Sequence, residues 1–107
     1  KQMPTDQGLA DWLEERQERF ITMADTIWAS PEVALTESKA CTLQADALER
    51  DGFTITRDVG GLPTAFMAEW GAGAPGIGYL GESGALPGRS QKSSQMLAPR
   101  PPACRRE

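Results

Sequence analysis

Apolar residues in the first quarter of the chain recur at the spacing of an α-helix. Over residues 9 to 28 they fall in steps of one, three, four or seven positions, which keeps them on one side of a helix with charged residues on the other. This pattern predicts one long amphipathic helix whose apolar stripe forms part of a core. The stripe is made of Leu9, Trp12, Leu13, Phe20, Met23, Ile27 and Trp28. Asp6 is a candidate N-cap, and Ser30 ends the helix because it precedes Pro31.

A second, shorter helix is predicted to begin after Thr36, whose hydroxyl can cap the free amides of the first turn. Its apolar positions are Cys41, Ala45 and Leu48. Gly52 follows as a residue suited to the left-handed conformation at a helix end. We expect the two helices to form a hairpin across residues 31 to 35.

Beyond the second helix the period changes from that of a helix to that of strands. Residues 53 to 57 alternate apolar and polar side chains, residues 65 to 70 form a second apolar run, and residues 77 to 80 form a third. Glycine pairs or clusters at 60 to 61 and 71 to 76 supply the turns between them. The sequence therefore predicts an α/β fold of order ααβββ, a two-helix hairpin packed on a short β-sheet.

The C-terminal part differs in composition and charge from what precedes it. Residues 1 to 80 carry six basic and thirteen acidic residues, whereas residues 81 to 107 carry five basic and two acidic. The last segment has no aromatic residue and no apolar period, and its prolines lie among Ser and Arg. We therefore divide the chain into a partial α/β catalytic-domain segment, residues 1 to 88, and a basic tail, residues 89 to 107, predicted to be disordered.

Composition limits the chemistry of the 107-residue chain. It contains no histidine, which excludes catalytic triads and histidine metal ligands within it. A net charge of −4 argues against nucleic acid or an anionic membrane surface as partner, and no apolar run is long enough to span a membrane. Cys41 and Cys104 form no C-x-x-C pair, and we interpret both as free thiols of a cytoplasmic protein.

Residues 71 to 76 read Gly-Ala-Gly-Ala-Pro-Gly and so match the G-x-G-x-x-G pattern of dinucleotide-binding sites. That site needs a helix to begin within the glycine-rich turn, so that its amides meet the pyrophosphate. Here the strand-like residues 77 to 80 follow instead. The motif is therefore interpreted as a hairpin turn.

Few acidic side chains lie at positions where they could act in catalysis or bind a ligand. Glu14, Glu15 and Glu18 are expected to form a solvated helix face. Glu82 lies at the end of the third predicted strand, a position where α/β sheets bind ligands, but an exposed loop glutamate is the favoured interpretation of a single acid. The basic tail, without aromatic residues to stack on bases, is interpreted as a soluble tail rather than a nucleic-acid site.

With these segments placed, the chain resembles the metal-dependent amidohydrolase and peptidase family of aminoacylases and carboxypeptidase-type enzymes, and within it the p-aminobenzoyl-glutamate hydrolase group. The resemblance covers roughly residues 9 to 92 and lies in the order of several short motifs. These are Ile27-Trp28, Pro31-Glu32, Asp51-Gly52-Phe53, Gly61-Leu62-Pro63-Thr64-Ala65-Phe66, Gly81-Glu82, Ala85-Leu86-Pro87-Gly88 and Ser90-Gln91.

The resemblance implies the N-terminal part of a catalytic domain that binds two zinc or manganese ions and hydrolyses amide bonds of acylated amino acids or small peptides. It also implies a homodimer formed through a domain absent from this chain. The family has an aspartate directly before Ala85, where this chain has Gly84, and an aromatic residue is common where it has Ser83. Cys104 lacks the histidines that accompany the cysteine ligand of this group. The resemblance therefore assigns no catalytic, cofactor-binding or metal-binding residue here.

Two hypotheses of function follow from the sequence. The favoured one is a truncated segment of such an amidohydrolase, inactive by itself, whose metal ligands and general base lie outside these residues. The loss of pattern near Arg89 is then expected from a change of reading frame. The alternative is a non-catalytic α/β interaction module that offers an unpaired sheet edge to a partner.

Overall fold

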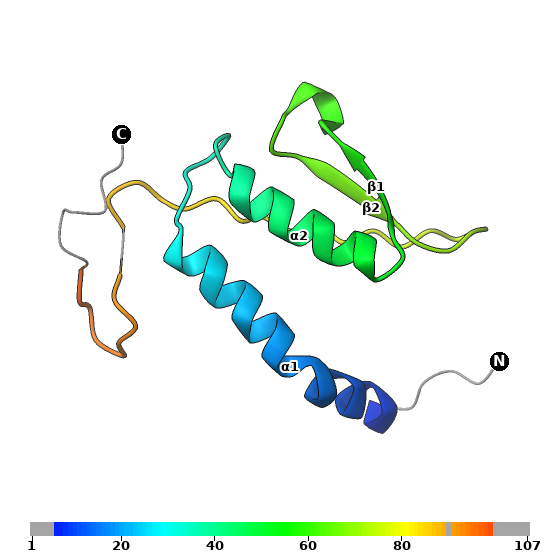
Figure 1. The fold of residues 1–107 in the computed structure, drawn as a ribbon, viewed down its shortest axis with the longest axis horizontal. Helices are drawn as coiled ribbons and strands as arrows, with labels where there is room; N and C mark the ends of the chain where they lie inside the picture. Colours follow the sequence, from blue (N-terminus) through cyan, green and yellow to red (C-terminus); the bar gives the residue numbers. More distant parts are fainter. Residues whose placement is uncertain (1–5, 90, 100–107) are drawn as a thin grey trace. The chain divides into compact units, whose positions relative to one another are not determined.

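The computed structural model describes residues 6 to 89 and 91 to 99, which divide into two compact units between Ser30 and Pro31. The first unit contains one helix, α1 (Asp6–Ala29). The second contains helix α2 (Ser38–Arg50), strand β1 (Thr54–Arg57), the short 3-10 turn η1 (Val59–Gly61) and strand β2 (Phe66–Glu69), all drawn in Figure 1. The expected small α/β arrangement is confirmed, and the packing of the two helices as a hairpin stays a prediction.

Helix α1 has the predicted extent, and its apolar stripe is not buried within its own unit. None of its 24 residues is buried, and Trp12, Phe20 and Trp28 are 44%, 39% and 47% exposed. The rings of Trp12 and Phe20 lie 6.0 Å apart, and the Arg16 guanidinium lies 4.5 Å from the Trp12 ring centre. Helical spacing shows which residues share a side but not which surface covers them, so burial of the stripe against another element stays a prediction.

Helix α2 ends in the manner its sequence predicts. Gly52 adopts a left-handed backbone with φ of 91°. Its amide donates to the Glu49 carbonyl at 3.0 Å, and the Phe53 amide donates to the Leu48 carbonyl at 3.1 Å. This pair of bonds is the Schellman motif, which satisfies carbonyls that have no partner within the helix. The motif stops α2 and directs the chain into β1.

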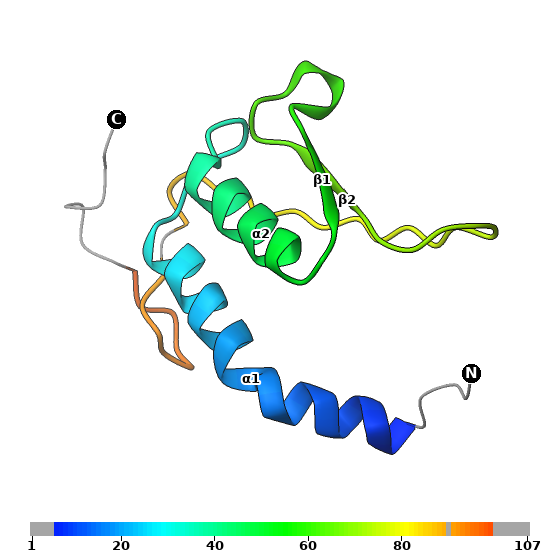
Figure 2. The same cartoon turned by 45° about the vertical axis from the view of Figure 1, so that its right-hand side comes forward.

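Small side chains form the core, which lies between α2 and the sheet. Both strands contact α2, as Figure 2 shows from a second direction. The buried residues among those described are Ala40, Cys41, Ala45 and Ala47, all on α2. Because these side chains are short, the helix backbone can approach the sheet closely, and larger apolar residues close the layer at its margins. Those half-buried residues are Leu43, Leu48, Phe53, Ile55, Phe66 and Ala68.

Strands β1 and β2 pair antiparallel, as predicted. Ile55 lies opposite Ala68, and Arg57 opposite Phe66. Along β1, Ile55 is half-buried between exposed threonines, so the alternation read from the sequence matches the two faces of the sheet. The Arg57 guanidinium also donates to the Asp46 carboxylate of α2 at 2.8 Å, which holds the strand to the helix.

The predicted third strand, residues 77 to 80, is absent from the described structure. The sheet has two strands, and Ile77, Tyr79 and Leu80 are 80%, 95% and 97% exposed. Their alternation is suited to a strand, but a strand needs both a hydrogen-bonding neighbour and a covered face, and here this segment has neither. The observed order is therefore ααββ rather than ααβββ.

The described part of the predicted tail has no helix or strand element, yet it has local structure. The Gln91 side chain donates to the Met96 carbonyl at 2.9 Å and accepts from the Ala98 amide at 3.2 Å. The Lys92 amide donates to the Ala98 carbonyl at 2.9 Å, closing a loop. The disorder predicted for residues 100 to 107 falls outside the described residues. Neither described helix is long and apolar enough to cross a membrane.

Candidate functional site at the start of helix α2

The first turn of α2 is held by a glutamate from the preceding loop. The Glu32 carboxylate accepts hydrogen bonds from the backbone amides of Lys39 at 3.1 Å and Ala40 at 3.0 Å, and from the Ser38 hydroxyl at 3.4 Å. A helix N-terminus carries unpaired amides and a partial positive charge, so a carboxylate there satisfies both at once. The Glu32 carboxylate is therefore engaged in a structural role.

The predicted cap, Thr36, does not act as one. Its hydroxyl donates to the Val33 carbonyl at 2.7 Å, and the residue that precedes the helix, Glu37, makes no side-chain capping bond. The Thr36 hydroxyl instead closes the loop that brings Glu32 back to the helix. Sequence reasoning missed Glu32 because its partners lie six to eight positions away, beyond the three-residue spacing of an ordinary cap.

Residues 84 and 85 lie beside this loop, although about fifty positions separate them from it in the sequence. The Ala85 amide donates to the Glu32 carbonyl at 2.7 Å, and Ala85 forms an isolated parallel bridge with Val33. The segment that follows the predicted third strand is thereby brought to the start of α2. This is the place where motifs 31 to 32 and 85 to 88 of the resemblance meet.

Gly84 lies directly against a carboxylate at this place. A Cβ atom added to Gly84 would lie 2.7 Å from Glu37 Oε1 and 3.7 Å from the Ala34 Cα. The resembled family carries an aspartate where this chain has Gly84, so here the side chain of Glu37 stands where that aspartate would begin. A carboxylate added at residue 84 would meet another carboxylate of the same charge.

The acidic residues do not gather into a metal-binding group. Among the described residues no three His, Cys, Asp or Glu side chains lie together in a way that could hold a metal ion. Glu82 is exposed, as favoured from the sequence. Since Glu32 is bound to amides and residue 84 is a glycine, the residues present do not fit the two-metal site that the resemblance implies for the family.

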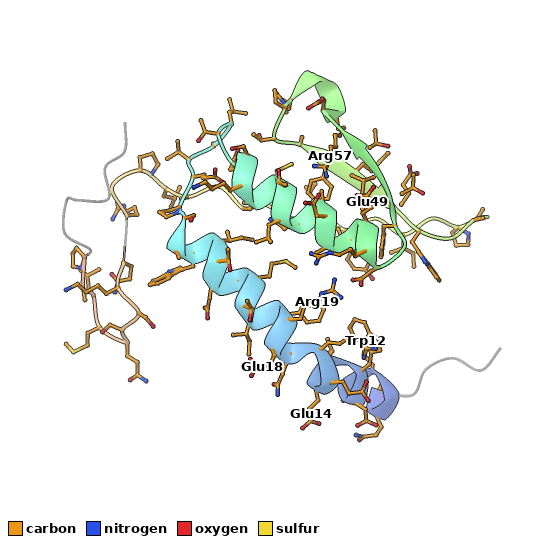
Figure 3. All side chains as sticks on the ribbon, viewed as in Figure 1. Trp12, Glu14, Glu18, Arg19, Glu49 and Arg57 are labelled. Atoms are coloured by element: carbon orange, nitrogen blue, oxygen red, sulfur yellow. The ribbon has the colours of Figure 1, made fainter. Side chains whose placement is uncertain are left out.

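None of the remaining candidates from the sequence forms a site among the described residues. Glu14 and Glu18 are exposed on α1, and Glu15 pairs with its neighbour Arg16 at 2.9 Å; Figure 3 labels Glu14 and Glu18. No helix follows the glycine-rich residues 71 to 76 within the described chain, so they lack the helix that a dinucleotide site needs. The predicted hairpin turn was wrong, because residues 77 to 80 form no strand that pairs with β2. Cys41 is a buried free thiol, and Cys104 lies outside the described residues.

Comparison with known proteins gives one clear relative. The chain is 45% identical over 83 residues to a p-aminobenzoyl-glutamate hydrolase subunit of Escherichia coli (strain K12). The chain is a relative of this hydrolase subunit. The match confirms the predicted resemblance to p-aminobenzoyl-glutamate hydrolase, and its length agrees with the expected range of about residues 9 to 92. It covers 78% of this chain but only 17% of the E. coli subunit. No family model and no solved structure matches the chain.

Proposed function

We propose that this chain is the N-terminal segment of a metal-dependent amide hydrolase and is inactive by itself. The observation that carries the proposal is the 45% identity to the E. coli p-aminobenzoyl-glutamate hydrolase subunit. The substrate in that name contains an amide between an aromatic acyl group and glutamate. Acylated amino acids and small peptides are therefore the substrate class proposed for the intact enzyme, with zinc or manganese as its metal.

Three observations support the lack of activity. The chain has no histidine, residue 84 is a glycine where the resembled family has an acid, and the Glu32 carboxylate is occupied by the amides of α2. A two-metal hydrolase needs several anionic or imidazole ligands around one point. The described residues supply no such group.

Partners and location form part of the same proposal. The relative is a subunit by name, which supports an assembly of more than one chain, and we propose a homodimer formed outside these residues. The buried free thiol of Cys41 supports a reducing, cytoplasmic location. Neither nucleic acid nor a membrane is a proposed partner.

The alternative function, a non-catalytic interaction module, is favoured by one observation. Residues 77 to 80 are exposed and unpaired beside a sheet of only two strands, and such a segment can add to the edge of a partner. An interaction module does not explain why the chain shares sequence with a hydrolase. The identity of 45% over 83 residues therefore places the hydrolase segment first.

The two functions differ in what the segment does inside the relative. The test is a chimera in which residues 9 to 88 of this chain replace the matching part of the E. coli subunit. Its hydrolysis of p-aminobenzoyl-glutamate is measured in the presence of zinc or manganese. We expect no activity from the chimera, and recovery when Gly84→Asp is added but not with Gly84→Asn. A folded chimera that stays inactive with Gly84→Asp contradicts the assignment, and turnover by the 107-residue chain alone contradicts its inactivity.

A further inference from the structure

Residues 70 to 81 form an apolar segment without a single charged side chain, in a chain that is 24% charged. Trp70 is 70% exposed, and the three large residues of 77 to 80 are 80 to 97% exposed. No backbone amide or carbonyl of residues 77 to 80 is hydrogen-bonded within the described structure. Figures 1 and 2 both draw the chain leaving β2, extending and turning back as a narrow loop.

Natural proteins protect such segments from pairing with other strands by placing charges or prolines on them. In this segment the single proline, Pro75, lies in the turn, so all amides of residues 77 to 80 remain available as donors. We propose that residues 77 to 80 are a self-association site, at which two copies of this chain pair as antiparallel strands.

The residues of this segment are complementary to themselves in one register. With Gly78 opposite Gly78 of the second copy, Ile77 lies opposite Tyr79, and a two-fold axis perpendicular to the pair relates the two strands. One face of the pair then carries both isoleucines and both tyrosines. Each tyrosine then lies across from a β-branched isoleucine, a cross-strand combination that stabilises strand pairing.

The absence of charge favours a second copy as the occupant. Identical strands that carry charges repel each other in most registers, whereas two copies of residues 77 to 80 oppose no like charges. Pairing also gives partners to backbone groups that have none in the described chain. The proposal concerns only this surface and holds whether or not the chain is a hydrolase segment.

Sedimentation equilibrium of the full 107-residue chain tests the proposal, together with amide hydrogen exchange of residues 77 to 80. Pairing of four residues buries little surface, so we expect a weak dimer that is detectable at protein concentrations up to about 1 mM. The amides of residues 77 to 80 should become protected in step with dimer formation. Tyr79→Lys places a charge in the paired strand and should raise the dimer Kd by about tenfold or more.

Leu97→Lys is the matched control, because Leu97 is 91% exposed, apolar and outside the segment. It adds the same charge and should leave the dimer Kd within about twofold, a change of less than half a kcal/mol. Three results overturn the proposal: a monomer at about 1 mM, a dimer whose residues 77 to 80 exchange freely, or equal weakening by both variants. The first result would mean that something other than a second copy covers the segment.

Discussion

Replacement of Glu32 tests whether this side chain, rather than Thr36, starts helix α2. Glu32 accepts from two backbone amides at 3.0 to 3.1 Å, and its side chain is half-buried. Loss of a helix cap costs about 1 kcal/mol, and loss of a negative charge at a helix N-terminus costs a further 0.3 to 1 kcal/mol, roughly. We expect Glu32→Ala to lower the free energy of unfolding by about 1 to 2 kcal/mol, and Glu32→Gln by about half as much.

Urea denaturation followed by circular dichroism at the helix band measures this loss. For a domain of this size the dependence of the unfolding free energy on urea is about 1 kcal/mol per molar, so Glu32→Ala should move the midpoint down by about 1 M or more. Glu49→Gln, labelled as Glu49 in Figure 3, removes the same charge from the last turn of α2. Since an acid is unfavourable at a helix C-terminus, that control should leave stability unchanged or slightly raised.

Thr36→Val separates the two explanations of how α2 begins. The Thr36 hydroxyl closes the loop by donating to Val33, so its removal should cost about 1 kcal/mol, the value of one hydrogen bond, without the loss of charge. If Glu32→Gln leaves the urea midpoint unchanged while Thr36→Val lowers helix content, the cap assigned to Glu32 is refuted.

Three further substitutions probe other parts of the second unit. Gly52→Ala should lower stability by about 1 to 2 kcal/mol, because φ is 91° and nothing lies within 4 Å, so the measured urea midpoint reports backbone strain alone. A double-mutant cycle on Arg57→Ala and Asp46→Ala should give a coupling of only about 0.2 to 1 kcal/mol, since both side chains are more than 40% exposed. Gly84→Asp should be less stable than Gly84→Asn, because two carboxylates about 4 Å apart repel by about 1 kcal/mol in water; equal stabilities would show that Glu37 moves away without cost.

Local sequence signals predicted the parts of the fold that local contacts decide. Gly52 follows the last apolar position of its helix, and the Schellman bonds form among residues at most five positions apart. The pairing of β1 with β2 was likewise predictable, because a short glycine-containing connection joins an alternating run to an apolar run. In both cases the residues that determine the structure are neighbours in the sequence.

The parts that were not predicted depend on contacts between distant residues. The carboxylate of Glu32 reaches α2 only because the intervening loop turns back, and no cap pattern contains that spacing. Residues 77 to 80 have the alternation of a strand, but strand formation depends on a neighbour that the described chain does not supply. For the same reason the sequence predicts the apolar stripe of α1, which is not buried within its own unit, but not the surface that would cover it.

Apolar side chains in the second unit exceed what its core can enclose. Among its described residues the core consists of four small side chains of α2, whereas several large apolar residues of the same unit are between 38% and 97% exposed. These include Val59, Leu62, Met67, Trp70, Ile77, Tyr79, Leu80 and Leu86. Isolated apolar residues on a surface are normal, but an uninterrupted uncharged segment such as 70 to 81 favours contact with another surface. This excess is expected if the chain is the proposed hydrolase segment, because strands inside a larger sheet are apolar on both faces. In the chain by itself, a second copy can cover these exposed residues.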